Sequence, residues 1–493
     1  MNYQDNPSTR SNVTPLFHRQ MPRVLLVLSV GIALALVFTA SVSGRQPTPD
    51  LQHAVQSLQI TAASDEHWSA YMVKDIYEGA TGSSPAKFAR VGNTLFFLAN
   101  DNTHGVELWK SDGTQAGTLL VADLNPGSSN SSFGELLGIQ DTLFFAVMNA
   151  PAPAFPNLWK SDGTEAGTVK LAGTWPDLLT NVSGTLFFRG SSGLWKSDGT
   201  ETGTVLVKSM YVDTVQDPSS PSMVGIQDTL FFVSSNCLWK SDGTEIGTVS
   251  VKCFSGIQRL AAFGNELVLI ASDGVNGYEL WKSDGTEGGT TMIKDTVPGD
   301  ASYAISCLAV ISDTLYFHAD DGVHGGELWK SDGTASGTVM VRDIYTGANT
   351  SYACQFTEAG DTVFFTADEG VYGRELWKTD GTKAGTVLVK DIYTGTGVSF
   401  PTVFGVLGNT LVFNSDDGIT GKEVWRSDGT EAGTMLIRDI YPGSGWSYAQ
   451  YMTEINGLIL FRATDGTHGY ELWAVRKSDY AVYLPIVLNN LSQ

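Results

Sequence analysis

Residues 401–443 read PTVFGVLGNTLVFNSDDGITGKEVWRSDGTEAGTMLIRDIYPG, in which four short apolar segments alternate with turn residues. The apolar segments are rich in Val, Ile, Leu, Phe and Trp. The breaks between them are Gly-Asn, Asp-Asp-Gly, Ser-Asp-Gly-Thr and Tyr-Pro-Gly motifs. Short β-prone segments punctuated by Gly, Asn and Asp predict consecutive hairpins. This stretch therefore predicts one four-stranded antiparallel sheet.

The same pattern recurs around nine tryptophans, which lie between 36 and 50 residues apart. Repeats of this length with four strands each are typical of propeller blades. We therefore expect an all-β fold, a single closed β-propeller of about nine four-stranded blades, with two smaller propellers as the alternative. Numbered as units one to nine, the tryptophans are Trp109, Trp159, Trp195, Trp239, Trp281, Trp329, Trp377, Trp425 and Trp473.

The two ends of the repeat region complement each other. The ninth unit stops soon after Trp473 and lacks a fourth strand, whereas residues 71–77 (YMVKDIY) precede the first unit and match the fourth-strand sequence of residues 435–441 (MLIRDIY). We expect the N-terminal strand to complete the last blade, because closing the ring removes exposed sheet edges.

Four segments are predicted along the chain: residues 1–44, a linker at 45–70, the repeats at 71–475 and a tail at 476–493. The first holds an apolar stretch at 24–43 that follows two arginines. It would be a membrane anchor if translation starts at Met1, or a signal peptide if it starts at Met21. Either start predicts export, so that the protein is secreted or held at the cell surface.

Acidic residues outnumber basic ones 52 to 30, which gives a formal charge of −22. A chain this acidic is unsuited to the phosphates of nucleic acids, which require a basic face. We therefore expect no nucleic-acid partner.

Four cysteines in an exported chain suggest two disulfides. Cys237 and Cys253 fall at facing positions of one hairpin, which predicts a bridge. Cys307 and Cys354 lie in the first strands of neighbouring units, where either a bridge or two buried free thiols would fit.

Three acids change together from unit to unit. Two of them, two residues before and fourteen residues after each tryptophan, should face each other across a hairpin, and the third lies in the preceding loop. The sets are Asp101, Glu107, Asp123; Asp273, Glu279, Asp295; Asp321, Glu327, Asp343; Glu369, Glu375, Asp391; Asp417, Glu423, Asp439; and Asp465, Glu471 with Asp75 from the closing strand. In units two to four the facing pairs are instead Asn157 and Gly173, Gly193 and Ser209, and Cys237 and Cys253.

Facing carboxylates repel each other unless something compensates their charge. Clustered oxygen ligands favour Ca²⁺ outside the cell, so the six sets are candidate calcium sites. The alternative is that the acids cap backbone N–H groups and anchor the loops. No other cofactor is predicted.

The sequence favours a non-enzymatic scaffold for binding or display. Paired carboxylates serve glycosidases, but a catalytic set normally occurs once in a chain, not six times, so no catalytic residue is assigned. The expected partner is a surface protein or glycan, and units two to four are the expected place for it. Trp175 and Trp446 are predicted mainly as packing residues. The alternatives are an enzyme acting on polysaccharide and a self-associating surface-layer protein.

The phrase ELWKSDGT at 107–114, 279–286 and 327–334 resembles the repeat of the bacterial ELWxxDGT repeat family. The resemblance covers about residues 71–475. It implies an exported, propeller-like surface protein with no established activity.

Overall fold

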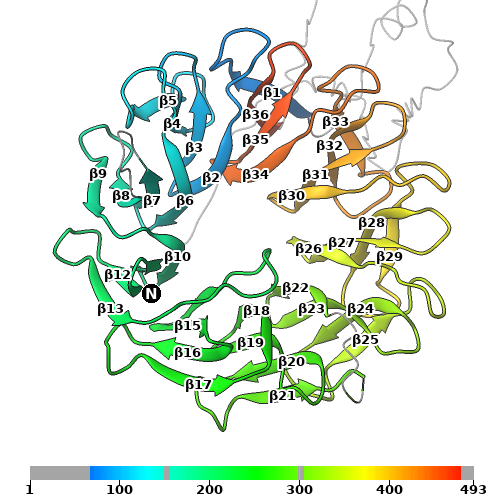
Figure 1. Cartoon of the computed structure of the whole chain (residues 1–493). Helices are drawn as coiled ribbons and strands as arrows, with labels where there is room; N and C mark the ends of the chain where they lie inside the picture. Colours follow the sequence, from blue (N-terminus) through cyan, green and yellow to red (C-terminus); the bar gives the residue numbers. More distant parts are fainter. Residues whose placement is uncertain (1–66, 149–155, 298, 300–304, 479–493) are drawn as a thin grey trace, which may run out of the picture. The chain divides into compact units, whose positions relative to one another are not determined.

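The computed structural model describes residues 67–148, 156–297, 299 and 305–478, and its compact repeat unit is Trp68–Ser478. The predicted N-terminal export segment and almost all of the predicted tail lie outside these residues. Within them the structure contains strands only, in nine four-stranded sheets arranged as a ring (Figure 1). None of the described residues forms a helix capable of crossing a membrane.

The nine sheets are the blades, numbered 1 to 9 in the chain order of their inner strands. The inner strands are β2 (Ala86–Val91), β6 (Ser132–Ile139), β10 (Asp177–Val182), β14 (Met223–Ile226), β18 (Gly256–Phe263), β22 (Ser306–Ile311), β26 (Cys354–Ala359), β30 (Thr402–Leu407) and β34 (Gln450–Ile455). The second strands are β3 (Thr94–Asn100), β7 (Thr142–Met148), β11 (Thr185–Gly190), β15 (Thr229–Ser234), β19 (Glu266–Ser272), β23 (Thr314–Asp320), β27 (Thr362–Asp368), β31 (Thr410–Asp416) and β35 (Leu458–Thr464).

The third strands carry the repeated tryptophans. They are β4 (Val106–Ser111), β8 (Asn157–Ser161), β12 (Gly193–Ser197), β16 (Cys237–Ser241), β20 (Tyr278–Ser283), β24 (Gly326–Ser331), β28 (Arg374–Thr379), β32 (Lys422–Ser427) and β36 (Tyr470–Ser478). The outer strands are β5 (Leu119–Ala122), β9 (Val169–Ala172), β13 (Val205–Ser209), β17 (Val249–Cys253), β21 (Thr291–Lys294), β25 (Val339–Arg342), β29 (Val387–Lys390), β33 (Met435–Arg438) and β1 (His67–Lys74).

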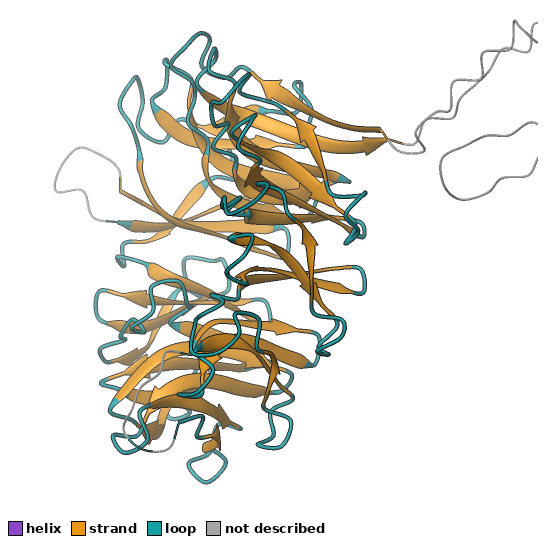
Figure 2. Ribbon diagram, turned by 90° about the vertical axis from the view of Figure 1, so that its right-hand side faces the viewer, coloured by secondary structure: helices purple, strands orange, loops and turns teal. Residues whose placement is uncertain are grey.

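The ring is a single propeller. Each inner strand contacts the inner strand of the next blade, and β34 of the last blade contacts β2 of the first. Seen edge-on in Figure 2, the blades are joined by loops on the two faces of the ring. The prediction of one nine-bladed β-propeller is confirmed, and the alternative of two smaller propellers is wrong.

The N-terminal strand closes the ring as predicted, because the last sheet has the order β1-β36-β35-β34. The Ile76 N–H donates to Glu471, and Arg476 Nε donates to the Ser69 hydroxyl, which places the two strands antiparallel. The strand begins at His67, four residues before the predicted start of the repeats at 71.

The predicted facing of positions across the third and outer strands is also confirmed. Gly193 pairs with Ser209, and Cys237 pairs with Cys253. In blades 1 to 8 a bulge beside the repeated tryptophan gives the outer strand one additional residue, as where Leu108 pairs with Ala122 but Trp109 pairs with Leu120. The bulge therefore sets which residues face one another at the loop end of the hairpin.

The Ser-Asp-Gly-Thr motif forms the turn between the third and outer strands. In blade 1, Asp112 Oδ1 accepts the N–H and the hydroxyl of Thr114 at 2.9 and 2.7 Å, and Gly113 adopts φ +90°. The Ser111 and Thr118 hydroxyls lie 2.8 Å apart and close the base of the turn. The motif is structural, in a connection that is longer than a two-residue hairpin.

Cations on the outer strands connect neighbouring blades. Lys74 Nζ lies 5.6 Å from the ring centre of Trp109 in the next blade and donates to the Thr118 carbonyl at 2.8 Å. This places the cation between one blade and the tryptophan of the following one, where it adds a cation–π contact to the apolar packing. The same contact recurs for Lys208, Lys252, Lys294, Arg342, Lys390 and Arg438.

Both cysteine pairs form disulfides. The Cys237–Cys253 bridge lies across one hairpin of blade 4, as predicted. The Cys307–Cys354 bridge joins β22 of blade 6 to β26 of blade 7, so the open choice for this pair is decided in favour of a bridge.

Removal of the inter-blade bridge should lower stability more than removal of the hairpin bridge. The bridged cysteines are 47 residues apart in Cys307–Cys354 and 16 apart in Cys237–Cys253. Chain-entropy arguments give about 4 and about 3 kcal/mol for loops of such lengths. We expect denaturant unfolding to rank the Cys307→Ser/Cys354→Ser variant below the Cys237→Ser/Cys253→Ser variant. The opposite order of stability would contradict the larger loop-closure entropy that is expected for the Cys307–Cys354 bridge.

Candidate functional site

The glutamate two residues before the tryptophan in each predicted set is a buried anchor for a loop. In blade 7, Glu375 is fully buried, and its carboxylate accepts the N–H groups of Ile392, Tyr393 and Ser399 at 3.0, 3.3 and 3.3 Å. The Ser399 hydroxyl donates to the same carboxylate at 2.6 Å. The loop from the outer strand of blade 7 to the inner strand of blade 8 is thereby wrapped around one side chain.

The other five blades with acid sets use the same device. In blade 9, Glu471 accepts donors from Ile76, Tyr77 and Ser83, so the anchor also ties the closing strand to the start of blade 1. Equivalent bonds are made by Glu107 to Leu124 and Ser131, Glu279 to Thr296, Glu327 to Ile344 and Tyr345, and Glu423 to Ile440, Tyr441 and Ser447.

Burial dominates the electrostatics of these glutamates. Loss of water raises the pKa of Glu375 to about 7, although the bonds from Ser399, Ile392 and Tyr393 oppose that rise. Burial likewise raises the pKa of Glu279, Glu327 and Glu423 to about 7 and raises the pKa of Glu107 and Glu471.

The aspartate fourteen residues after the tryptophan supports the same loop in blades 1, 6, 7 and 8. Asp391 Oδ2 accepts the Gly395 N–H at 3.1 Å, and Asp439 bonds to Gly443 in the same way. The other carboxylate oxygen of this aspartate is buried and has no hydrogen-bond partner. These atoms are the Oδ1 of Asp75, Asp123, Asp295, Asp343, Asp391 and Asp439.

The remaining acid of each set lies in the loop between the second and third strands and organises that loop. Asp321 Oδ1 accepts the N–H groups of Val323 and His324 at 2.9 Å, and Asp321 Oδ2 lies 2.8 Å from His324 Nδ1. This bond to Asp321 raises the pKa of His324, against the opposing effect of burial. The same pair recurs as Asp101 with His104 and as Asp465 with His468. Asp273 and Asp417 organise their loops through Asn276 and Thr420, and Glu369 occupies this position in blade 7.

These contacts support loop anchoring. In the part of the chain that the structure describes, no three His, Cys, Asp or Glu residues are grouped so as to hold a metal ion. Each anchoring glutamate instead accepts donors from its own loop. Calcium binding at the six sets stays a prediction.

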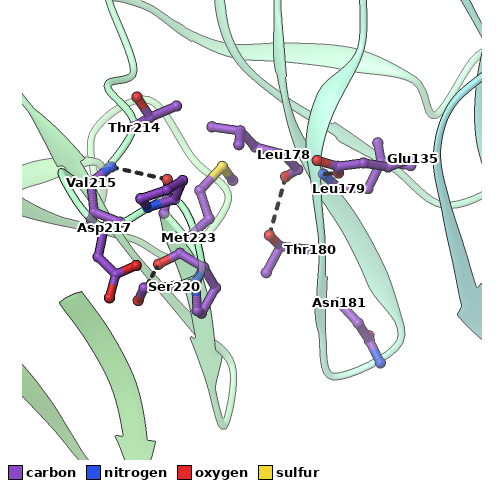
Figure 3. A pocket seen from close by; sticks show the side chains of 13 residues that line it. Glu135, Leu178, Leu179, Thr180, Asn181, Thr214, Val215, Asp217, Ser220 and Met223 are labelled. Carbon is purple, nitrogen blue, oxygen red and sulfur yellow. Dashed lines mark hydrogen bonds between the residues drawn. The ribbon is translucent and has the colours of Figure 1, made fainter. Parts of the chain in front are cut away.

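Blades 2 to 4 lack the anchors, and a pocket of about 520 Å³ lies at their inner ends. Its walls are β10 of blade 3 and the long segment that leads into β14 of blade 4, as Figure 3 shows. Leu178, Val215 and Met223 supply apolar surface, while Glu135 of blade 2 accepts the Leu179 N–H at 2.8 Å. The pocket therefore combines apolar walls with polar groups already held in place.

Sequence reasoning located the variant blades but missed this pocket. The segment before β14, residues 210–222, is only two residues longer than the 11-residue connections at 343–353 and 391–401, so its length is a weak signal in the sequence. Residues 151–155 of unit two, which is one of the units expected to bind the partner, lie outside the described residues. Trp175 and Trp446, predicted mainly as packing residues, are 51% and 45% exposed, and Trp446 lies 5.6 Å from Tyr448 between ring centres.

No protein-family model matches the chain, and no curated protein matches it. Among solved structures, BamB from Moraxella catarrhalis is similar, with 12% identity and a TM-score of 0.38 over 71% of this chain and 96% of BamB. A puromycin hydrolase structure has 12% identity and a TM-score of 0.37 over 82% of this chain and 62% of the hydrolase. A structure from a study of two prolyl endopeptidases has 12% identity and a TM-score of 0.40 over 81% and 54%. Such likenesses concern the fold alone.

Replacing an anchoring glutamate by its amide should destabilise the protein in a pH-dependent way. In Glu375→Gln, the amide NH₂ group faces backbone donors, which should cost about 1–3 kcal/mol. Because the pKa of Glu375 is raised to about 7, the folded protein holds this proton more tightly than the unfolded chain does. The wild-type contribution from this site therefore falls as pH rises from about 4.5 to about 7.

The difference in unfolding free energy between wild type and Glu375→Gln should thus be larger at pH 5 than at pH 8. Denaturant unfolding at both values measures it, and the exposed turn residue Glu431, changed to Gln, is the control. A difference that grows with pH would contradict the raised pKa.

The effect of calcium on the melting temperature tests which of the two predicted roles the acid sets have. A ligand that binds only the folded protein raises stability, whereas acids that only anchor loops leave it unchanged by calcium. Because the glutamates of the sets already accept protein donors, we expect equal melting temperatures in EGTA and in millimolar calcium. A rise with calcium that is lost in Glu279→Gln/Glu327→Gln would show instead that the predicted calcium sites exist.

Proposed function

We propose that the protein is an exported, non-enzymatic β-propeller scaffold that binds a partner at the cell surface. One observation carries the proposal. Six carboxylate sets, the groups best suited to chemistry, are occupied by bonds to their own loops, whereas a pocket lies where those sets are missing. Because these acids bind the loops of their own blades, we assign binding of the partner to blades 2 to 4.

The compartment is part of the proposal. Two disulfides fit an oxidising environment outside the cytosol. The apolar segment at 24–43 and the resemblance to the exported ELWxxDGT repeat proteins point in the same direction.

Filling the pocket should abolish partner binding and leave the fold intact. Thr214 lines the pocket and is exposed, so Thr214→Trp adds bulk there with no change to a buried side chain. The wild-type protein, screened against arrays of surface glycans and cell-envelope proteins, should bind at least one ligand. Thr214→Trp should bind that ligand at least tenfold more weakly at an unchanged melting temperature.

Two results would replace the proposal. Release of new reducing ends from a polysaccharide, lost with a single acidic residue, would make the protein an enzyme. Sedimentation showing ordered self-association, with no ligand on either array, would make it a structural surface-layer component.

A further inference from the structure

We infer that the inner ends of blades 7, 8 and 9 form a binding track for a neutral polysaccharide chain. The track is built on three side chains, Tyr352, Phe400 and Tyr448, which we call the aromatic arc. The inference goes beyond the proposed function, because it adds a second binding surface on other blades than those that form the pocket.

The members of the aromatic arc occupy one structural position in three consecutive blades. Each follows a buried serine whose carbonyl accepts an N–H from the second strand or its end. The three bonds run from Asp368 to Ser351, from Asp416 to Ser399 and from Thr464 to Ser447, at 2.8, 3.0 and 2.9 Å. Because the inner strands β26, β30 and β34 contact one another in order, the three rings follow the ring of blades.

The backbone at these positions is unfavourable for large residues. The φ values are +52° for Tyr352, +43° for Phe400 and +49° for Tyr448. This left-handed region favours glycine, and a bulky residue there is strained. The side chains are 57%, 49% and 47% exposed, so about half of each ring lies outside the core. The exposed part of each ring is therefore accessible to a ligand.

The buried glutamates hold the aromatic arc in place. Glu375 binds both the N–H and the hydroxyl of Ser399, the residue before Phe400, and Glu423 binds the Ser447 N–H next to Tyr448. The loop ahead of Tyr352 is tied to Glu327. These glutamates are positioning residues. They order the loops that carry the rings before the ligand binds, so less conformational entropy is lost on binding.

Polar and aromatic groups extend the surface around the rings. His318 stacks on Tyr352 at 6.5 Å between ring centres, and Arg374 lies 5.1 Å from the same ring. At the other end, Tyr448 lies 5.6 Å from Trp446. The aromatic arc therefore combines flat apolar faces with hydrogen-bond donors.

A neutral polysaccharide fits this arrangement best. One ring per blade suits a ligand with a repeating unit, and each sugar offers a C–H face for stacking and hydroxyl groups for hydrogen bonds. A polyanion would be repelled by a chain of net charge −22. A protein partner would require a closely packed apolar patch at its centre, whereas these rings are separated blade by blade.

Affinity electrophoresis of the full chain in gels containing soluble neutral polysaccharides, namely hydroxyethyl-cellulose, xylan and mannan, tests the inference. We expect retardation in at least one gel and at least tenfold weaker retardation for Tyr352→Gly/Phe400→Gly/Tyr448→Gly. Glycine relieves the positive φ, so this variant should melt no lower than wild type. Ile246→Ala, which removes a 91% exposed apolar side chain outside both the aromatic arc and the pocket, is the control and should be retarded normally.

Unretarded wild-type protein in every gel would overturn the glycan class, while Thr214→Trp would still test the pocket separately. Normal retardation of the triple variant would place glycan binding elsewhere on the scaffold. A lowered melting temperature for the triple variant would show that the rings serve packing, and loss of binding to a protein partner in place of a glycan would assign the aromatic arc to protein recognition.

Discussion

A carboxylate removed from water must be satisfied by other donors, and in this protein those donors are the N–H groups of the loop that leads to the next blade. The bond from the Ser399 N–H to Glu375 is typical, because it fixes the chain three residues before the following inner strand, β30, begins. The same bond in blade 9 reaches Ser83 and so fixes the start of the first blade. The geometry of blades 1, 2 and 6 to 9 thus depends on a buried glutamate in the blade before.

Blades 2 to 4 show what happens without that constraint. In blade 4 the two facing positions are joined by the Cys237–Cys253 bridge, and the hairpin is held covalently. The connection into β14 is longer than elsewhere and forms one side of a pocket. Without the glutamate, the loop to the next blade can therefore differ in length and conformation, but it loses the anchor that the regular blades share.

Much of the fold could be predicted because its signals are local and repeated. The spacing from Trp109 to Trp473 predicted the blades, and residues 71–77 predicted the closing strand. Facing positions follow from hairpin pairing, which is why the Cys237–Cys253 bridge was predictable. The role of Glu327 was not, since the same acids suit a cation or a set of N–H donors, and only the direction of the loop backbone distinguishes the two. The exposure of Trp175 depends on a positive φ that its sequence context does not reveal.

Closure by the first strand also determines where the ring would open if its two chain ends were pulled apart. Arg476 reaches Ser69, and Lys477 lies 5.8 Å from the Trp68 ring, so the two chain ends of the propeller are neighbours across one strand pair. A force that pulls those ends apart would load the hydrogen bonds between β1 and β36 one after another, as in unzipping, and not all at once, as in shear. Under tension the ring should therefore open at its own closure, blade 9 first, while the other eight blades remain folded.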